Sequence, residues 1–478
     1  MNLADLRHFV SRKWDDDLVP RLVDYVRVPA KSPAFDASWA AHGYLASVVR
    51  DAEAWCRAQN IAGITIEIVA IDGRTPCLLF DVPATGGRGN DRTVLFYGHL
   101  DKQPEMVGWR EDLGPWKPVI GDGRLYGRGS ADDGYAIYAA LTTIAAIDAQ
   151  GAARPRCVGI IETCEESGSP DLPAYLELLT PRFGDVQLVV GLDSGCRNYE
   201  QLWVTTSLRG LVGGTLTVEI LSEGVHSGHA SGIVPSSFRI ARQLLNRLDD
   251  PANGRVLLPE LHADIPAERV QQARDAGVIL GDTVWTEFPW VSCDHGSGRA
   301  HAMPVTTDPV EGILNRTWRP ALAVTGAAGF PSIDSAGNVL RPKTTLKLSM
   351  RIPPTVDGER ATQALRKALT RDPPYDARVT FEADWGAIGW NAPPTAPWLR
   401  QALDDASRQV YGKDAAWIGE GGTIPFMNML GERFPQAQFL ITGVLGPHSN
   451  AHGPNEFLHI AYAKQLTAAV ATVVTSVR

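Results

Sequence analysis

Short apolar segments separated by a helical one constrain the fold of this chain more than any other feature of its sequence. Thr93–Tyr97, Cys157–Glu162 and Gln187–Leu192 are almost continuously apolar, which is typical of strands covered on both faces. Tyr135–Ala149 lies between the first two and is rich in alanine, leucine and isoleucine, which predicts a buried helix. Strands that alternate with helices predict an α/β fold with a mixed, mostly parallel sheet sandwiched by helices.

The middle of the chain has a different periodicity. Gly213–Leu221 and Thr344–Arg351 alternate between apolar and polar residues, as strands with one solvated face do. Ser236–Leu248 has the pattern of an amphipathic helix. We therefore expect a small α+β domain over residues 208–385.

The signals of core strands and helices return from about Trp398. We therefore expect residues 1–207 and 386–478 to form one domain in two parts, with the α+β domain inserted between them. Residues 249–315 have weak periodicity and give no clear prediction.

Composition excludes several classes of partner. The 478-residue chain has a net charge of −9, which argues against nucleic-acid binding. No segment reaches the run of about 18 apolar residues that spans a bilayer, and the N-terminal residues lack the apolar core of a signal peptide. The six cysteines are scattered without a CxxC pair, which favours small buried thiols in a reducing compartment. We therefore expect a cytoplasmic protein without a nucleic-acid or membrane partner.

Acidic residues and histidines follow the predicted strands, where open α/β sheets place their sites. His99 and Asp101 are two residues apart, so both side chains point to one face of an extended segment. A carboxylate beside an imidazole fixes the tautomer of a metal-binding histidine. Taken alone, the His-x-Asp pattern is more typical of a surface turn.

Two pairs of adjacent carboxylates come next. Asp132 and Asp133 precede the predicted helix, where they are costly unless a cation or the helix N-terminus stabilises them, and an N-cap is the alternative. Glu165 and Glu166 follow a core strand and repel each other, which raises one pKa unless a metal holds the other residue. A ligand beside a base is the division that metal-assisted hydrolysis requires, and a solvated loop is the alternative.

Asp193 follows the third strand, and His448 and His452 lie in a loop far along the chain. Together with the earlier segments they supply imidazoles and carboxylates without thiolates. Such ligands suit Zn, Mn or Co, and a site with open positions is catalytic rather than structural.

These segments resemble the motifs of the M20 family of metallopeptidases, the group of carnosinase, carboxypeptidase G2 and succinyl-diaminopimelate desuccinylase. The matching segments, in the family's order, are GHLD (98–101), GRGSADD (127–133), the EE of CEESGS (165–166), LDSG (192–195), HSG (226–228) and NAHGPNE (450–456). The resemblance implies a catalytic domain, residues 1–207 and 386–478, interrupted by a lid or dimerisation domain, and hence a homodimer.

The resemblance also implies a ligand set for two divalent metal ions per subunit, Zn²⁺ or alternatively Mn²⁺ or Co²⁺. Asp132 would bridge the two ions. His99 and Asp193 would complete the first site, and Glu166 and His452 the second.

The implied catalytic residues are Glu165, Asp101 and His226. Glu165 would be the general base that takes a proton from a metal-bridging water, so that hydroxide attacks the amide, and then passes this proton to the leaving amine. Asp101 would form a hydrogen bond with His99. His226 of the lid domain would stabilise the oxyanion, often from the partner subunit.

The resemblance suggests that Arg351, Gly422 and Thr423 bind the substrate's carboxylate, although Arg351 could also be an ordinary residue at a strand end. Three features depart from the family pattern: Gly134 stands where a lysine is common, His448 is an additional histidine, and residues 249–315 match no motif. His229, His295, His301 and His459 have no support from a motif.

The sequence therefore predicts a hydrolase of dipeptides or small peptides. The alternative within the family is an N-acyl-amino-acid amidohydrolase of the desuccinylase or deacetylase type. A non-catalytic binding protein on a hydrolase fold is the alternative from another class, and it should have lost a ligand or the base.

Overall fold

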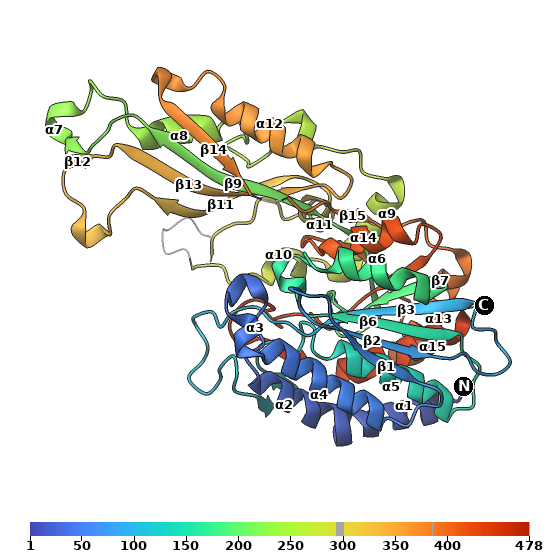
Figure 1. Ribbon diagram of the computed structural model, residues 1–478. Coiled ribbons are helices and arrows are strands. Elements are labelled where there is room, and N and C mark those ends of the chain that lie inside the picture. The colour runs from blue at the N-terminus through green and yellow to red at the C-terminus, as the bar shows by residue number, and fades with distance from the viewer. Residues whose placement is uncertain (293–300, 385, 478) are drawn as a thin grey trace. The chain divides into compact units, whose positions relative to one another are not determined.

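The computed structural model describes residues 1–292, 301–384 and 386–477, and the chain divides into two compact units (Figure 1). Unit 1 comprises Met1–Thr206, Ala392–Ile418 and Met429–Arg478, and unit 2 comprises Ser207–Asn391 and Gly419–Asn428. Cys293 and His295 lie outside the described residues. No helix among the described residues is long and apolar enough to cross a membrane.

A six-stranded sheet forms the centre of unit 1. Its order is β1 (Thr65–Val69), β2 (Cys77–Val82), β6 (Arg156–Glu162), β3 (Arg92–His99), β7 (Asp185–Gly191) and β17 (Gln438–Ile441). The last four strands pair in parallel, whereas β2 pairs antiparallel with both β1 and β6. The prediction of a mixed, mostly parallel sheet is confirmed.

Helices cover both faces of this sheet (Figure 1). α4 (Tyr44–Ala58) and α5 (Ala136–Ala149) lie on one side, and α6 (Leu172–Phe183) lies on the other. α5 is buried almost all round because α15 (Ile460–Ser476) packs on its outer side. The remaining long helices of unit 1 are α1 (Leu3–Lys13), α2 (Val19–Arg27) and α13 (Pro397–Tyr411).

Two small three-stranded sheets are also present. One has the order β18 (Phe457–His459), β5 (Arg124–Tyr126) and β4 (Val119–Gly121). The other has the order β15 (Trp390–Asn391), β8 (Trp203–Leu208) and β16 (Ala416–Glu420). The first of these sheets bears on the site. In it, β5 leads into the polar loop 127–133, and β18 follows the polar loop 450–456.

Unit 2 is built on a four-stranded antiparallel sheet. Its order is β11 (Ala321–Ala328), β13 (Lys343–Ile352), β9 (Gly210–Glu219) and β14 (Arg378–Ala383). α8 (Ser237–Leu245) and α12 (Gly358–Thr370) pack on the sheet and enclose a core that includes Leu216, Leu244 and Met350. The alternating burial along β13 is that of a sheet covered on one face, so the predicted α+β architecture is present.

Residues 249–315, which gave no clear prediction, contain helices. These are α9 (Ala267–Leu280), α10 (Thr283–Thr286) and α11 (Pro309–Thr317), and residues 293–300 of this stretch lie outside the described part of the chain. α9 buries Arg269 and Gln272 together with small apolar residues, which explains why its helical period was hard to see.

The two units divide the chain differently from the expected domains at three places. We expected Ser207 and residues 386–391 and 419–428 in the first domain, whereas they group with unit 2. Ala387 exchanges backbone hydrogen bonds with Leu211, and Arg209 Nε donates to Gly421 O at 3.2 Å. Residues 386–391 and 419–428 are thereby hydrogen-bonded to the segment at the start of β9.

Candidate metal centre

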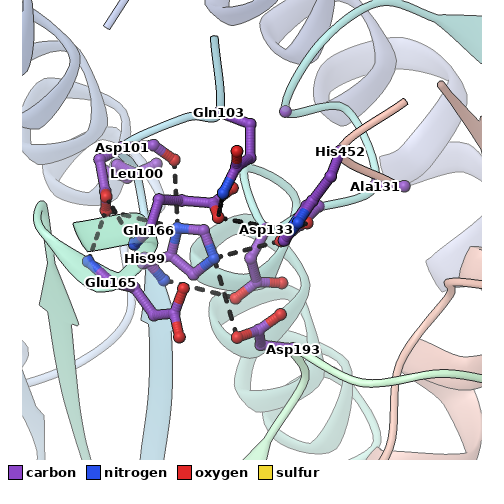
Figure 2. A network of polar contacts seen from close by, with 12 residues as sticks. His99, Leu100, Asp101, Gln103, Ala131, Asp133, Glu165, Glu166, Asp193 and His452 are labelled. Carbon is purple, nitrogen blue, oxygen red and sulfur yellow. Dashed lines mark hydrogen bonds and ion pairs between the residues drawn. The ribbon is translucent and has the colours of Figure 1, made fainter. Parts of the chain in front are cut away.

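Three neighbouring strands of the unit 1 sheet deliver acidic residues and a histidine to one edge (Figure 2). His99 is the last residue of β3, the turn Glu165–Ser167 follows β6, and Asp193 follows β7. Because these strands are parallel neighbours in the order β6-β3-β7, their carboxyl ends meet at the same place.

Asp132 lies between two histidines that are far apart in the sequence. Its Oδ1 is 3.3 Å from His99 Nε2, and its Oδ2 is 3.0 Å from His452 Nε2. His99 Nε2 also lies 3.8 Å from Asp193 Oδ2, and His452 Nε2 lies 3.3 Å from Glu166 Oε2. Each oxygen of Asp132 therefore faces one imidazole, which is the arrangement of a carboxylate that bridges two cations.

Atoms that could bind a metal ion cluster in two groups that share His99. One group is His99, Asp132 and Glu166, and the other is His99, Glu165 and Asp193; the atoms of each lie within 4.8 Å of one another. His448 is exposed on the loop that carries His452, and no described contact links it to this cluster.

Asp101 is fully buried and positions the backbone of the turn that carries the two glutamates. Its two carboxylate oxygens accept the backbone N–H groups of Glu165 and Glu166, at 3.1 and 3.0 Å. His99 Nδ1 lies 3.1 Å from the carbonyl oxygen of Asp101 and 3.4 Å from Oδ1. Since only acceptors face Nδ1, that atom carries a proton, and Nε2 is the ring nitrogen directed at Asp132 and Asp193.

Gln103 is a site residue that the sequence reasoning missed. Its Nε2 donates to Glu166 Oε2 at 2.6 Å, so the amide orients that carboxylate (Figure 2). The position two residues after Asp101 on the same loop was the only available signal.

Crowding of buried carboxylates perturbs their ionisation. Burial raises the pKa of Glu165 well above its ordinary value, and the charge of Asp193 adds to this. Burial and the charge of Asp132 raise the pKa of Glu166 to about 8. Burial lowers the pKa of His452, but the hydrogen bond to Asp132 and the charge of Glu166 outweigh it and raise this pKa to about 10.

The donor set fits divalent cations. Four carboxylates and two imidazoles converge; burial and the neighbouring carboxylates raise the pKa of Glu165, Glu166 and Asp193, whereas the two histidines lower that of Asp132. His99 Nε2 is buried without a hydrogen-bond partner among the described residues, although it points at two carboxylates. Oxygen and imidazole nitrogen donors without sulfur suit Zn, Mn or Co.

The other predicted site residues belong to unit 2. His226 ends the short strand β10 (Val225–His226) and is exposed. Arg351 Nη1 donates to Thr423 Oγ1 at 2.8 Å, and Thr423 Oγ1 donates to the carbonyl oxygen of Arg209 at 2.6 Å. The structure thus brings Arg351 and Thr423 together, with Gly422 beside them in the chain.

An imidazole and carboxylate cluster at the carboxyl ends of parallel strands, with adjacent glutamates, defines a metal-dependent hydrolase. Residues 95–476 match the model of "Peptidase family M20/M25/M40", so the chain belongs to this family of metal-dependent peptidases.

Curated relatives and solved structures agree with this assignment. The chain is 28% identical over 391 residues to the "Cys-Gly metallodipeptidase DUG1" of Saccharomyces cerevisiae, covering 79% of this chain and 77% of that protein. It is 26% identical over 411 residues to the human "Beta-Ala-His dipeptidase", covering 82% and 76%. Its fold matches the crystal structure of human carnosine dipeptidase 1 with a TM-score of 0.76 and 21% identity, over 100% of this chain and 99% of that one.

Proposed function

We propose that this chain is a dinuclear metallodipeptidase, which hydrolyses the amide bond of free dipeptides. The observation that carries the proposal is the position of Asp132, with one oxygen toward His99 and the other toward His452. The relatives named above supply the substrate class, because both act on dipeptides by name.

The proposed ligands divide into two sets that share Asp132. His99 and Asp193 hold the first ion, and Glu166 and His452 hold the second. We propose zinc as the metal, since it accepts both imidazole and carboxylate ligands in catalytic sites. When bound, the two ions supply Lewis acidity, which lowers the pKa of water and polarises the scissile carbonyl.

Glu165 is the proposed general base. It accepts the proton of the attacking water and passes it to the nitrogen of the leaving amine. Its main-chain N–H is fixed on Asp101, so its side chain starts from a defined position beside Asp193 and His99. Asp101 also keeps the proton of His99 on Nδ1, which leaves Nε2 free to bind a metal ion.

Arg351 and Thr423 are the proposed binding residues for the substrate's terminal carboxylate, together with the backbone at Gly422. Arg351 has no acidic partner among the described residues, and burial lowers its pKa. A partly buried guanidinium without a counter-ion favours an anionic ligand, which a fork of N–H donors can bind at two points.

The assembly and location of the enzyme belong to the same proposal. Unit 2 acts as a lid and dimerisation domain, and His226 donates to the developing oxyanion from the partner subunit. The five cysteines within the described residues are buried thiols, which fits a reducing compartment, and we propose the cytoplasm.

Hydrolysis of a substrate panel by the zinc-loaded full chain tests this function. The panel contains free dipeptides, the same dipeptides with a C-terminal amide, and N-acyl amino acids. We expect turnover of the free dipeptides only. Glu165→Ala should reduce kcat by about 10²–10⁴-fold while two ions per chain remain bound.

Other outcomes contradict separate parts of the proposal. Turnover of N-acyl amino acids alone would assign the chain to the amidohydrolase alternative and leave the metal ligands unaffected. Equal turnover of dipeptides and their amides would remove the carboxylate-binding role from Arg351. Full activity of Glu165→Ala would exclude that residue as the base.

A further inference from the structure

Arg128 connects three loops, each of which carries a proposed metal ligand or a residue bound to one. Its Nε donates to the carbonyl oxygen of Pro104 at 3.2 Å, on the loop that contains Gln103. Its Nη2 donates to the carbonyl oxygens of His452 and Gly453, at 3.1 and 2.8 Å. Arg128 itself lies four residues before Asp132. The Arg128 side chain therefore binds the main chain of the loop after Gln103 and that of the loop that carries His452.

Glu456 completes this connection. Its Oε2 accepts from Arg128 Nη1 at 2.7 Å, and both side chains are buried, with exposed fractions of 1% for Arg128 and 0% for Glu456. Its Oε1 accepts the backbone N–H groups of Gly129 and Ala131, at 3.0 and 3.3 Å. The segment before Asp132 is thus bound through its amides to the segment after His452.

We propose that Arg128 is a positioning residue for the second metal ion, acting with Glu456 to hold His452 and Asp132 at a binding separation. This inference rests on the proposed function for the identity of the ligands. Arg128 contacts no ligand side chain; it acts on the main chain at His452 and, through Glu456, on the main chain beside Asp132.

The chemistry of the contacts requires arginine at this position. Four acceptors in two segments surround the guanidinium, and its planar fork addresses them in fixed directions. A lysine ammonium has three donors at a single atom and cannot span these acceptors. Arg128→Lys therefore keeps the charge that balances Glu456 but releases the loop of His452.

The effect on the two ions should be unequal. His452 belongs only to the second set of ligands, whereas His99 and Asp193 of the first set are fixed by the ends of β3 and β7. The shared ligand Asp132 keeps its support in Arg128→Lys, because Glu456 still accepts the N–H groups of Gly129 and Ala131. Loss of a group that orients metal ligands typically weakens metal binding 10–100-fold. We expect this loss for one ion, with the affinity for the other ion unchanged within about threefold.

Zn²⁺ titration of the chelator-treated full chain, against a competing chromophoric chelator, tests the proposal. Wild type should bind two ions, and Arg128→Lys should weaken one step by about 10–100-fold. His452→Ala identifies which step belongs to the second site, and Arg128→Lys should weaken the same one. Excess Zn²⁺ should restore kcat in Arg128→Lys.

Arg156→Lys is the matched control. Arg156 binds a carboxylate with Nε, donating to Asp81 Oδ1 at 2.8 Å, and donates to two backbone carbonyls, but it lies at the opposite end of β6. We expect a lower Tm in this variant with both zinc affinities unchanged. If Arg128→Lys shows only the same fall in Tm, or weakens both steps equally, the positioning role is wrong.

Glu456→Gln provides a second variant if Arg128→Lys does not fold. Its amide NH₂ would face the N–H donors of Arg128, so the pair is broken while the side-chain volume is kept. The same zinc step should weaken; unchanged zinc affinities would overturn the proposal. The titration uses no substrate, so a wild-type protein that binds two ions but cleaves no dipeptide would contradict the proposed function alone.

Discussion

Glu162 is a buried carboxyl group at the end of β6, close to the metal centre but outside its ligand set. Tyr97, Ser169 and Cys164 donate to it, at 2.6, 2.9 and 3.2 Å. Burial raises its pKa to about 7 in spite of these donors. Since this pKa exceeds that of an unfolded glutamate, its contribution to stability is complete in acid and is lost as the pH rises through about 7.

Glu162→Gln should therefore change the pH dependence of stability. Glutamine is neutral at every pH, so the variant gains relative to wild type as the pH rises from about 5 to about 8, by about 2 kcal/mol. The measurement is the difference in free energy of unfolding between the two chelator-treated proteins. Glu177→Gln, at an exposed position on α6, is the control and should show a constant difference. A constant difference for Glu162→Gln as well would contradict the assigned pKa.

At this scale the sequence predicted well those residues that follow strands. His99, Glu166 and Asp193 could be placed together because parallel strands bring their carboxyl ends to one edge. Their roles as ligands stay a prediction. Gln103, Arg128 and Glu456 were missed as supporting residues because their contacts join loops that no periodicity relates.

At the scale of elements, the packing of α8 on the unit 2 sheet gives a test of that unit by itself. Leu244 is fully buried in the core between α8 and the strands. Leu244→Ala should destabilise unit 2 by about 2–5 kcal/mol, because it removes apolar contacts and leaves a cavity. Hydrogen exchange of the β9 and β13 amides should accelerate accordingly, while zinc binding in unit 1 is unchanged.

Val278→Ala is the control for this substitution. Val278 is 87% exposed on α9, so its truncation should change stability by less than about 0.5 kcal/mol. Equal exchange rates in the two variants would mean that α8 does not stabilise the sheet.

The predictability of elements followed their hydrophobic patterns. α5 begins one residue after the predicted start and ends at the predicted residue, since its alanine, leucine and isoleucine residues are buried on almost every side. α9 could not be predicted because Arg269 and Gln272 occupy its covered face, where Arg269 donates to Asn391 Oδ1 at 2.9 Å. When polar residues occupy the covered face of a helix, its apolar residues do not recur with the helical period.

At the scale of the whole molecule, the proposed action of His226 across subunits has a decisive test. In a mixed dimer of Glu165→Ala and His226→Ala chains, one site has both an intact base and the partner's histidine, if the histidine acts across the interface. Random pairing of equal amounts should then recover about one quarter of wild-type activity, although each variant is nearly inactive alone. No recovery, with mixed dimers demonstrated by a tag, would place His226 and Glu165 of one chain in the same site.

The division of the chain was the least predictable property at this scale. Its inserted α+β part could be recognised from the change of strand period, but residues 419–428 carry no such change. They group with unit 2, where the Arg209 side chain binds the carbonyl oxygen of Gly421 and Thr423 contacts Arg351 and the Arg209 carbonyl. Hydrogen bonds between segments this far apart in the sequence leave no trace in composition.

Asp101 binds Glu165 and Glu166 through their backbone N–H groups and not through their side chains. Substitution at position 165 therefore leaves the scaffold of this turn intact. A variant with a non-ionisable residue at position 165 should still bind metal and substrate. Such a variant can be used to isolate natural ligands from cell extracts. Because the backbone of this turn does not depend on the side chain at position 165, that position is also a suitable starting point for directed evolution.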